Sequence, residues 1–84
     1  LKDPSVVDKD GRTALMIAAR DGYIKNVETL IQKGANIDAV DKNGWTALMM
    51  ASCKGHFEIV KYLIEYGANI DAVNKIGWTA LMYA

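Results

Sequence analysis

The sequence predicts an all-α solenoid of stacked helix-turn-helix units, which are joined by β-turn or hairpin-like loops. The first observation is a period of 33 residues: Gly11, Gly44 and Gly77 are in phase, and each lies two residues before a Thr-Ala-Leu-Met run. The second is the similarity of the units, because residues 8–40 and 41–73 are identical at 19 of 33 positions. A fixed period of this length is typical of proteins in which each unit buries its apolar face only against its neighbours.

The period divides the chain into four parts. Residues 8–40 and 41–73 are complete units, residues 74–84 begin a third, and residues 1–7 are the remnant of a preceding loop. Both ends fall out of register with the period, so we expect further repeats in the full-length chain. A chain of 84 residues has a small core, and a repeat array of this size forms one quasi-linear domain.

Each unit begins with a four-residue turn. Asp8, Asp41 or Asn74 opens the turn, and an Asp or Asn side chain there can accept a hydrogen bond from the backbone N–H two residues further on. The in-phase glycine closes the turn, because glycine adopts a positive φ without steric cost. We therefore expect the turns to protrude as well-ordered loops.

A first helix follows each turn. It begins after Thr13, Thr46 or Thr79, since a threonine oxygen can accept a hydrogen bond from an unpaired N–H in the first turn of a helix. Its body is small and apolar, which allows neighbouring helices to pack closely. Gly22 and Gly55 separate this helix from the next one.

A second helix is predicted over residues 24–33 and again over residues 57–66. Val60, Leu63 and Ile64 have the i, i+3, i+4 spacing that places apolar side chains on one helix face. The other face carries charged residues, and a Gly-Ala-Asn segment ends the helix.

These motifs together resemble the ankyrin repeat family over residues 7–84. The elements are Asp-x-x-Gly-x-Thr before the first helix, a glycine between the helices, and Leu-Ile followed three residues later by Gly-Ala-Asn. The usual Thr-Pro-Leu-His of the family reads Thr-Ala-Leu-Met here, and Asn26 stands where the next unit has Ile59. The resemblance implies an ankyrin-repeat solenoid that recognises proteins through its concave surface.

Composition disfavours several other classes of protein. Ten basic and ten acidic residues give no net charge, which argues against binding to nucleic acid or to an anionic membrane. No apolar run is long enough to span a membrane. The single cysteine, Cys53, cannot form an internal disulfide, so we expect an intracellular, cytoplasmic protein, with a secreted effector as the alternative.

No residue pattern predicts a catalytic site, a metal site or a cofactor. His56 is the only histidine, and it has no partner ligand or base at a repeated spacing, so we expect it to cap or pack the loop. Cys53 likewise lacks the base of a nucleophilic pair. Asp38 and Asp71 are 33 residues apart, one in each unit, and we expect them to bind loop amides.

The resemblance places the candidate partner-binding residues on the turns and on the inner face of the first helices. The thirteen residues of this set are Lys9, Asp10, Arg12, Arg20, Asp21, Lys42, Asn43, Trp45, Cys53, Lys54, Lys75, Ile76 and Trp78. Six of them are cations, and two are anions. The excess of cations favours a protein or peptide partner that is acidic and has apolar anchors; a merely solvated charged face is the alternative.

Two sets of apolar residues allow two interpretations each. Trp45 and Trp78 either contact the partner, as aromatic residues often do at interfaces, or shield the turn from water. The in-phase methionines Met16, Met49 and Met82 either pack between the repeats or form a soft binding patch.

The sequence therefore predicts a protein–protein interaction module, not an enzyme. The alternative is a structural or regulatory ankyrin segment of a larger enzyme, channel or secreted effector, in which the array positions or masks another domain.

Overall fold

The computed structural model of the chain describes residues 7–83. It contains five helices, which are α1 (Ala14–Asp21), α2 (Ile24–Gln32), α3 (Ala47–Lys54), α4 (Phe57–Glu65) and α5 (Ala80–Tyr83). Within the described range there is no β-strand; the backbone makes an isolated antiparallel bridge between Val7 and Thr13. The predicted all-α class is confirmed.

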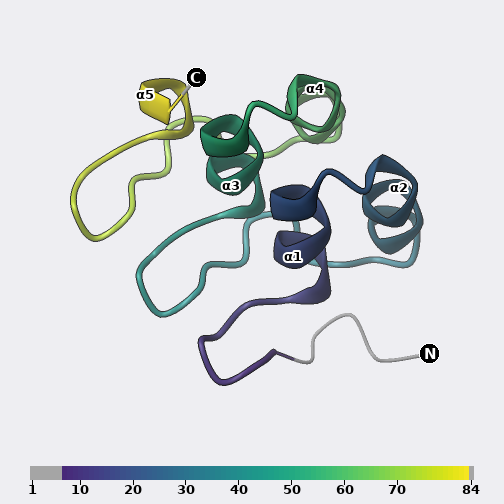
Figure 1. Cartoon of the computed structure of the whole chain (residues 1–84), viewed down its shortest axis with the longest axis horizontal. Coiled ribbons are helices and arrows are strands. Elements are labelled where there is room, and N and C mark those ends of the chain that lie inside the picture. The colour runs from purple at the N-terminus through teal and green to yellow at the C-terminus, as the bar shows by residue number, and fades with distance from the viewer. Residues whose placement is uncertain (1–6, 84) are drawn as a thin grey trace.

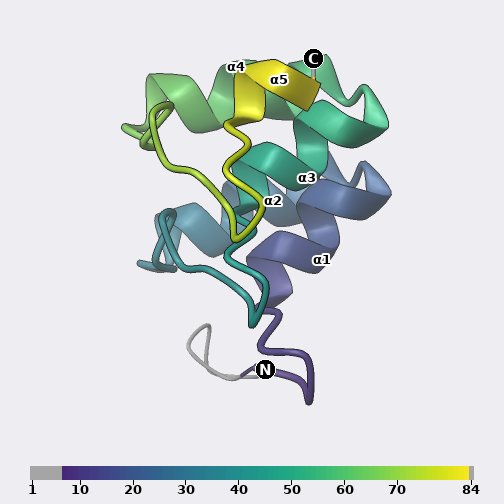
Figure 2. The same ribbon diagram turned by 90° about the vertical axis from the view of Figure 1, so that its left-hand side faces the viewer.

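The helices form two rows. Figure 1 shows α1, α3 and α5 in an inner row and α2 and α4 in an outer row, while the turns before α3 and α5 project to the same side as the turn before α1. In Figure 2 the units rise one above another from α1 to α5. α1 packs on α3, and α3 packs on α5, so the inner row is continuous through the stack. This arrangement is the predicted solenoid.

The predicted second helices are one residue too long. Lys33 and Tyr66 each follow the last helical residue, and their ψ angles of 3° and 17° have left the helical range. A difference of one residue is usual, because the final turn of a helix frays and has no hydrogen bonds beyond it.

Threonine begins the first helix in both complete units, as predicted. Thr13 Oγ1 accepts a hydrogen bond from the Met16 backbone N–H, and Thr46 Oγ1 accepts one from Met49, both at 3.2 Å. The Thr13 N–H in turn donates to Met16 Sδ at 3.4 Å, so methionine replaces the acidic residue of a reciprocal cap. Met16 and Met49 are each 1% exposed, which supports packing between repeats and not a binding patch.

Met82, the third methionine in phase, behaves differently because it lies in the last described helix. Its side chain is 56% exposed, as no following helix covers it in the described residues.

Equivalent positions of the outer helices reveal which side faces which neighbour. Ile59 and Leu63 in α4 are at most 1% exposed. Of their in-phase counterparts in α2, Asn26 is exposed and Leu30 is half-buried. The reverse holds for Val27, which is fully buried while its counterpart in α4 is half-buried. Each unit therefore uses one side of its outer helix against the preceding unit and the other side against the following one, and Asn26 occupies a side that no described residue covers.

Polar contacts tie one unit to the next. The Lys42 N–H donates to the Asp10 carbonyl at 3.1 Å, and the contact one repeat later, from Lys75 to Asn43, is 3.0 Å long. These bonds hold the tips of successive turns in register. Asp38 Oδ1 also accepts a hydrogen bond from the Asn69 N–H at 2.9 Å, which confirms its expected role toward loop amides.

His56 makes a further contact between the two complete units. Its Nε2 donates to the Arg20 carbonyl oxygen at 3.1 Å, and its ring lies against Gly22. His56 does not cap α4 through its side chain. Of the two structural roles that we expected for this residue, packing is confirmed and side-chain capping is wrong.

The residue that opens each turn fixes the turn through its side chain. Asp41 is only 8% exposed, and its Oδ1 accepts hydrogen bonds from the N–H groups of Asn43 at 2.9 Å and Trp45 at 3.0 Å. Asn74 makes the same pair of bonds one repeat later, at 3.1 and 3.0 Å. The turns before α3 and α5 thus present the residues that follow them in the same geometry.

Candidate functional site

A hollow of about 330 Å³ lies in the corner between the turns and the inner helices. Eight residues line it. The turns contribute Arg12, Asp41, Asn43 and Trp45, and the inner helices contribute Arg20, Met50, Cys53 and Lys54. We call this site the basic hollow. The structure thus brings together six of the residues that the sequence predicted as partner-binding, and Asp41 and Met50 join them.

The cations of the basic hollow differ in how they are paired. Arg20 Nε donates to Asp21 Oδ1 at 3.0 Å, and this hydrogen bond lowers the pKa of the Asp21 carboxyl, so the pair stays ionised near neutral pH. Arg12 Nη1 is 3.6 Å from Asp10 Oδ2, while Arg12 Nε is buried and has no hydrogen-bond partner among the described residues. Lys54 is exposed and forms no ion pair with any carboxylate of residues 7–83.

Asp41 is the one carboxylate in the lining of the basic hollow. Because it is buried and accepts two backbone N–H bonds, its role is to hold the turn. The hollow therefore presents mainly positive charge to a ligand.

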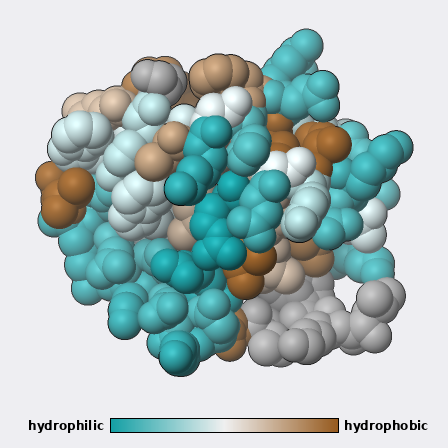
Figure 3. Space-filling model, in the orientation of Figure 1, coloured by the Kyte–Doolittle hydropathy of each residue, from teal (hydrophilic) through white to brown (hydrophobic). Residues whose placement is uncertain are grey.

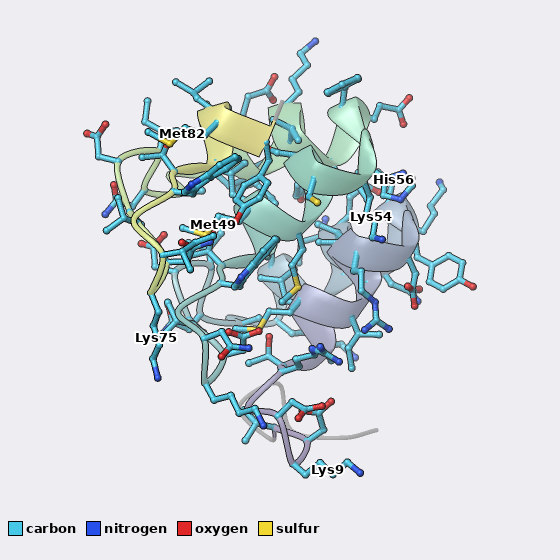
Figure 4. All side chains as sticks on the ribbon, turned by 60° about the vertical axis from the view of Figure 1, so that its left-hand side comes forward. Lys9, Met49, Lys54, His56, Lys75 and Met82 are labelled. Carbon is cyan, nitrogen blue, oxygen red and sulfur yellow. The ribbon has the colours of Figure 1, made fainter. Side chains whose placement is uncertain are left out.

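The remaining predicted residues lie outside the lining of the hollow: Asp21 ends α1, and the others lie on the projecting turns. Asp10 connects two cations there, since its second oxygen is 3.3 Å from Lys42 Nζ. Figure 4 shows Lys9 and Lys75 on turns, far from Lys54, which lies near His56 at the other end of the surface. Ile76 is 70% exposed at the tip of the last turn. Cations are therefore spread over the whole surface and not gathered at one point.

An aromatic row continues the surface beyond the basic hollow; it consists of Trp45, Tyr83 and Trp78. The ring centre of Tyr83 is 4.6 Å from that of Trp45 and 5.0 Å from that of Trp78, at tilted angles that favour aromatic pairs. Asn74 Nδ2 donates to the Tyr83 hydroxyl at 2.7 Å, which fixes the middle ring. Trp78 is 42% exposed, whereas Trp45 is half-buried and also packs against the core. Both tryptophans therefore pack against Tyr83, and Trp78 keeps part of its surface accessible.

Sequence reasoning did not select Asp41, Met50 or Tyr83 for this surface. A signal for them exists, because residues 34–51 and 67–84 differ at only three of 18 positions: Asp41 is Asn74, Asn43 is Ile76, and Met50 is Tyr83. Asp41, Asn43 and Met50 all line the basic hollow. The three differences between these segments therefore fall at the hollow, although Asp41 also holds its turn and Met50 also packs in the core.

Other kinds of site have no support in the described residues. Residues 7–83 contain no group of three or more His, Cys, Asp or Glu side chains that could hold a metal ion. None of the described helices is long and apolar enough to cross a membrane. Figure 3 shows mainly hydrophilic residues on the face that it presents, with hydrophobic residues in separate patches.

Comparisons with known proteins agree with the fold. A search of curated proteins gave no significant match. A family profile described as ankyrin repeats in many copies matches residues 16–64 and 50–84, which together are most of the chain. The overlapping matches include all the helices described above except the first two residues of α1. On this basis, and on the stacked architecture, the chain belongs to the ankyrin repeat family.

Proposed function

We propose that the chain is a protein–protein interaction module that binds an acidic, partly apolar protein or peptide segment on its concave surface. Ankyrin repeats are in general protein–protein interaction modules. The observation that supports this surface most strongly is the hollow itself, in which Arg12, Arg20 and Lys54 lie beside Trp45.

Rigidity favours this kind of binding. The turns are fixed internally by Asp41 and Asn74 and are joined to one another by backbone hydrogen bonds from Lys42 and Lys75. A surface that is already ordered pays little conformational entropy when a partner binds. Because the described residues form two complete units and the start of a third, we expect a contact smaller than the standard interface of roughly 800 Å² per partner, and affinities of about micromolar or weaker.

The two kinds of residue on the surface have different kinetic roles. Solvent-exposed cations at the rim mainly accelerate association, whereas aromatic side chains that become buried hold the complex together. Replacing both Trp45 and Trp78 with alanine is expected to raise the dissociation rate by about tenfold or more. Reversing Lys42 and Lys75 to glutamate is expected to lower the association rate by about tenfold at low salt, and to weaken its dependence on salt.

The experiment selects a peptide from a random library displayed against the chain and then measures its rates by surface plasmon resonance. A matched control reverses Lys25 and Lys61, which are exposed on the outer helices α2 and α4 and carry the same charges. We expect acidic peptides with apolar residues, for which the control changes the association rate less than about twofold. If the control slows association as much as the reversal of Lys42 and Lys75, or if the selected peptides are basic, the proposed surface is wrong.

A further inference from the structure

We infer that the concave surface consists of two unlike subsites in a fixed order along the stack. The basic hollow between the first and second units takes a carboxylate, and the aromatic row between the second and third units takes an apolar side chain. The occupant is an extended segment of a partner protein in which these two groups are about three residues apart. This inference rests on the proposed function and specifies its ligand.

The two subsites occupy equivalent positions of successive repeats but differ in character. Arg12, Trp45 and Trp78 occupy the same position in three successive repeats. At two of the three positions that differ between the later repeats, Asn43 gives way to Ile76, and Met50 gives way to Tyr83. Polarity therefore falls and aromatic content rises from the first unit toward the third.

A carboxylate suits the basic hollow because the protein does not fully satisfy the cations of the hollow. Arg12 Nη1 is 3.6 Å from Asp10 Oδ2, which is longer than a hydrogen bond. Arg12 Nε is buried and therefore closed to a ligand. Lys54 is exposed, lines the same hollow and is unpaired within the described range. A ligand carboxylate would supply the acceptor that Lys54 lacks.

The local charge favours a single negative charge on the ligand. Arg20 pairs with Asp21, and Arg12 lies near the carboxylates of Asp8 and Asp10, so Lys54 is the lining cation that has no carboxylate partner among the described residues. A single carboxylate matches this one charge, whereas a phosphate, which carries about −1.5 to −2, exceeds it. We therefore assign a Glu or Asp side chain, and not a phosphorylated residue, to this subsite.

The aromatic row suits an apolar side chain because its rings are held in place. Tyr83 lies between Trp45 and Trp78 in ring contact with both, and Asn74 fixes its hydroxyl. Trp78, which is 42% exposed, leaves part of its ring free for a ligand. Trp45 belongs to both subsites, since it also lines the basic hollow, so the two subsites are adjacent.

The stacking of the helices sets the spacing of the two ligand groups. Packed helices lie about 8–10 Å apart, and an extended chain rises about 3.3 Å per residue. A segment that runs along the stack therefore advances by one repeat in about three residues.

The test uses twelve-residue Gly/Ser peptides that each carry one Glu and one Phe, separated by one, three or six positions. Their dissociation constants for the whole chain are measured by NMR titration. We expect the separation of three to bind about tenfold more tightly than the other two. Replacing Glu with phosphoserine at this separation is expected to give no gain in affinity. Equal affinity at all separations overturns the spacing, and a tenfold gain with phosphoserine overturns the carboxylate assignment.

Double-mutant cycles assign each ligand group to its subsite. Lys54→Gln is expected to weaken the Glu peptide but not its Gln analogue, and Trp78→Ala is expected to remove the benefit of Phe over Ala. Lys54 and Trp78 are both exposed, and circular dichroism checks that each variant is folded. If Lys54 couples to Phe, or Trp78 couples to Glu, the assignment of Glu to the basic hollow and of Phe to the aromatic row is wrong. If the library-selected peptide still depends on Trp45 and Trp78 while these cycles show no coupling, the subsites are wrong but the proposed function stands.

Discussion

Replacing Gly44 with alanine is expected to lower the free energy of unfolding by about 2–5 kcal/mol. Gly44 has a φ of +79°, a conformation that costs a residue with a Cβ about 1–2 kcal/mol. A Cβ at this position would also lie 3.1 Å from both the Cα of Asn74 and the backbone nitrogen of Lys75. Because these are backbone atoms held by the contact between successive turns, relieving the overlap would separate the repeats, at a further cost of about 1–3 kcal/mol.

Gly77 provides the matched control for this substitution. It has nearly the same φ, +82°, but a Cβ there would meet no atom of residues 7–83 within 4 Å. Gly77→Ala is therefore expected to cost only the conformational term, about 1–2 kcal/mol. Urea unfolding followed by circular dichroism measures both variants. Equal losses for the two would mean that the close approach of the turns contributes nothing to stability.

Replacing Leu48 with alanine is expected to lower the free energy of unfolding by about 2–5 kcal/mol. Leu48 is 2% exposed on α3, which packs between α1 and α5, so the substitution leaves a cavity inside the stack. Small domains have a free energy of unfolding of only about 5–15 kcal/mol, so this loss removes a large share of the stability.

Leu81 is the in-phase control for Leu48, because it has the same place in the repeat but is 70% exposed. Leu81→Ala is expected to change the free energy of unfolding by less than about 0.5 kcal/mol. Thermal unfolding of both variants compares them directly. A loss for Leu81→Ala as large as that for Leu48→Ala would show that position in the stack does not decide how much a residue contributes.

The sequence was sufficient for features that depend on neighbouring residues. The threonine caps at Thr13 and Thr46 join residues three apart, and the turn contacts of Asp41 reach two and four residues along the chain. Local hydrogen bonds of this kind have fixed sequence spacings, so a repeated motif predicts them reliably. The candidate surface could also be placed in outline, since each repeat carries its turn and inner helix in the same way.

The partners in most contacts between repeats could not be predicted, because they depend on how side chains meet after stacking. Tyr83 is 38 residues from Trp45 in sequence, yet their rings are 4.6 Å apart. Asp10 binds Lys42 of the next turn, and His56 reaches the carbonyl of Arg20 in the preceding unit. The spacing of residues within one repeat specifies none of these three contacts. The side-chain rotamers that form them follow from the packing of the whole stack.

The rate at which iodoacetamide alkylates Cys53 tests most directly whether a partner binds on the concave surface. Cys53 is the only cysteine of the chain, is exposed, and lines the basic hollow. The library-selected peptide, at about ten times its dissociation constant, is expected to slow alkylation by about tenfold, because only the free protein reacts. The control carries Cys53→Ser and Glu58→Cys, which moves the thiol to an exposed position of α4, and its rate is expected to stay unchanged. An unchanged rate at Cys53 together with protection of the thiol at position 58 would contradict binding on the concave surface.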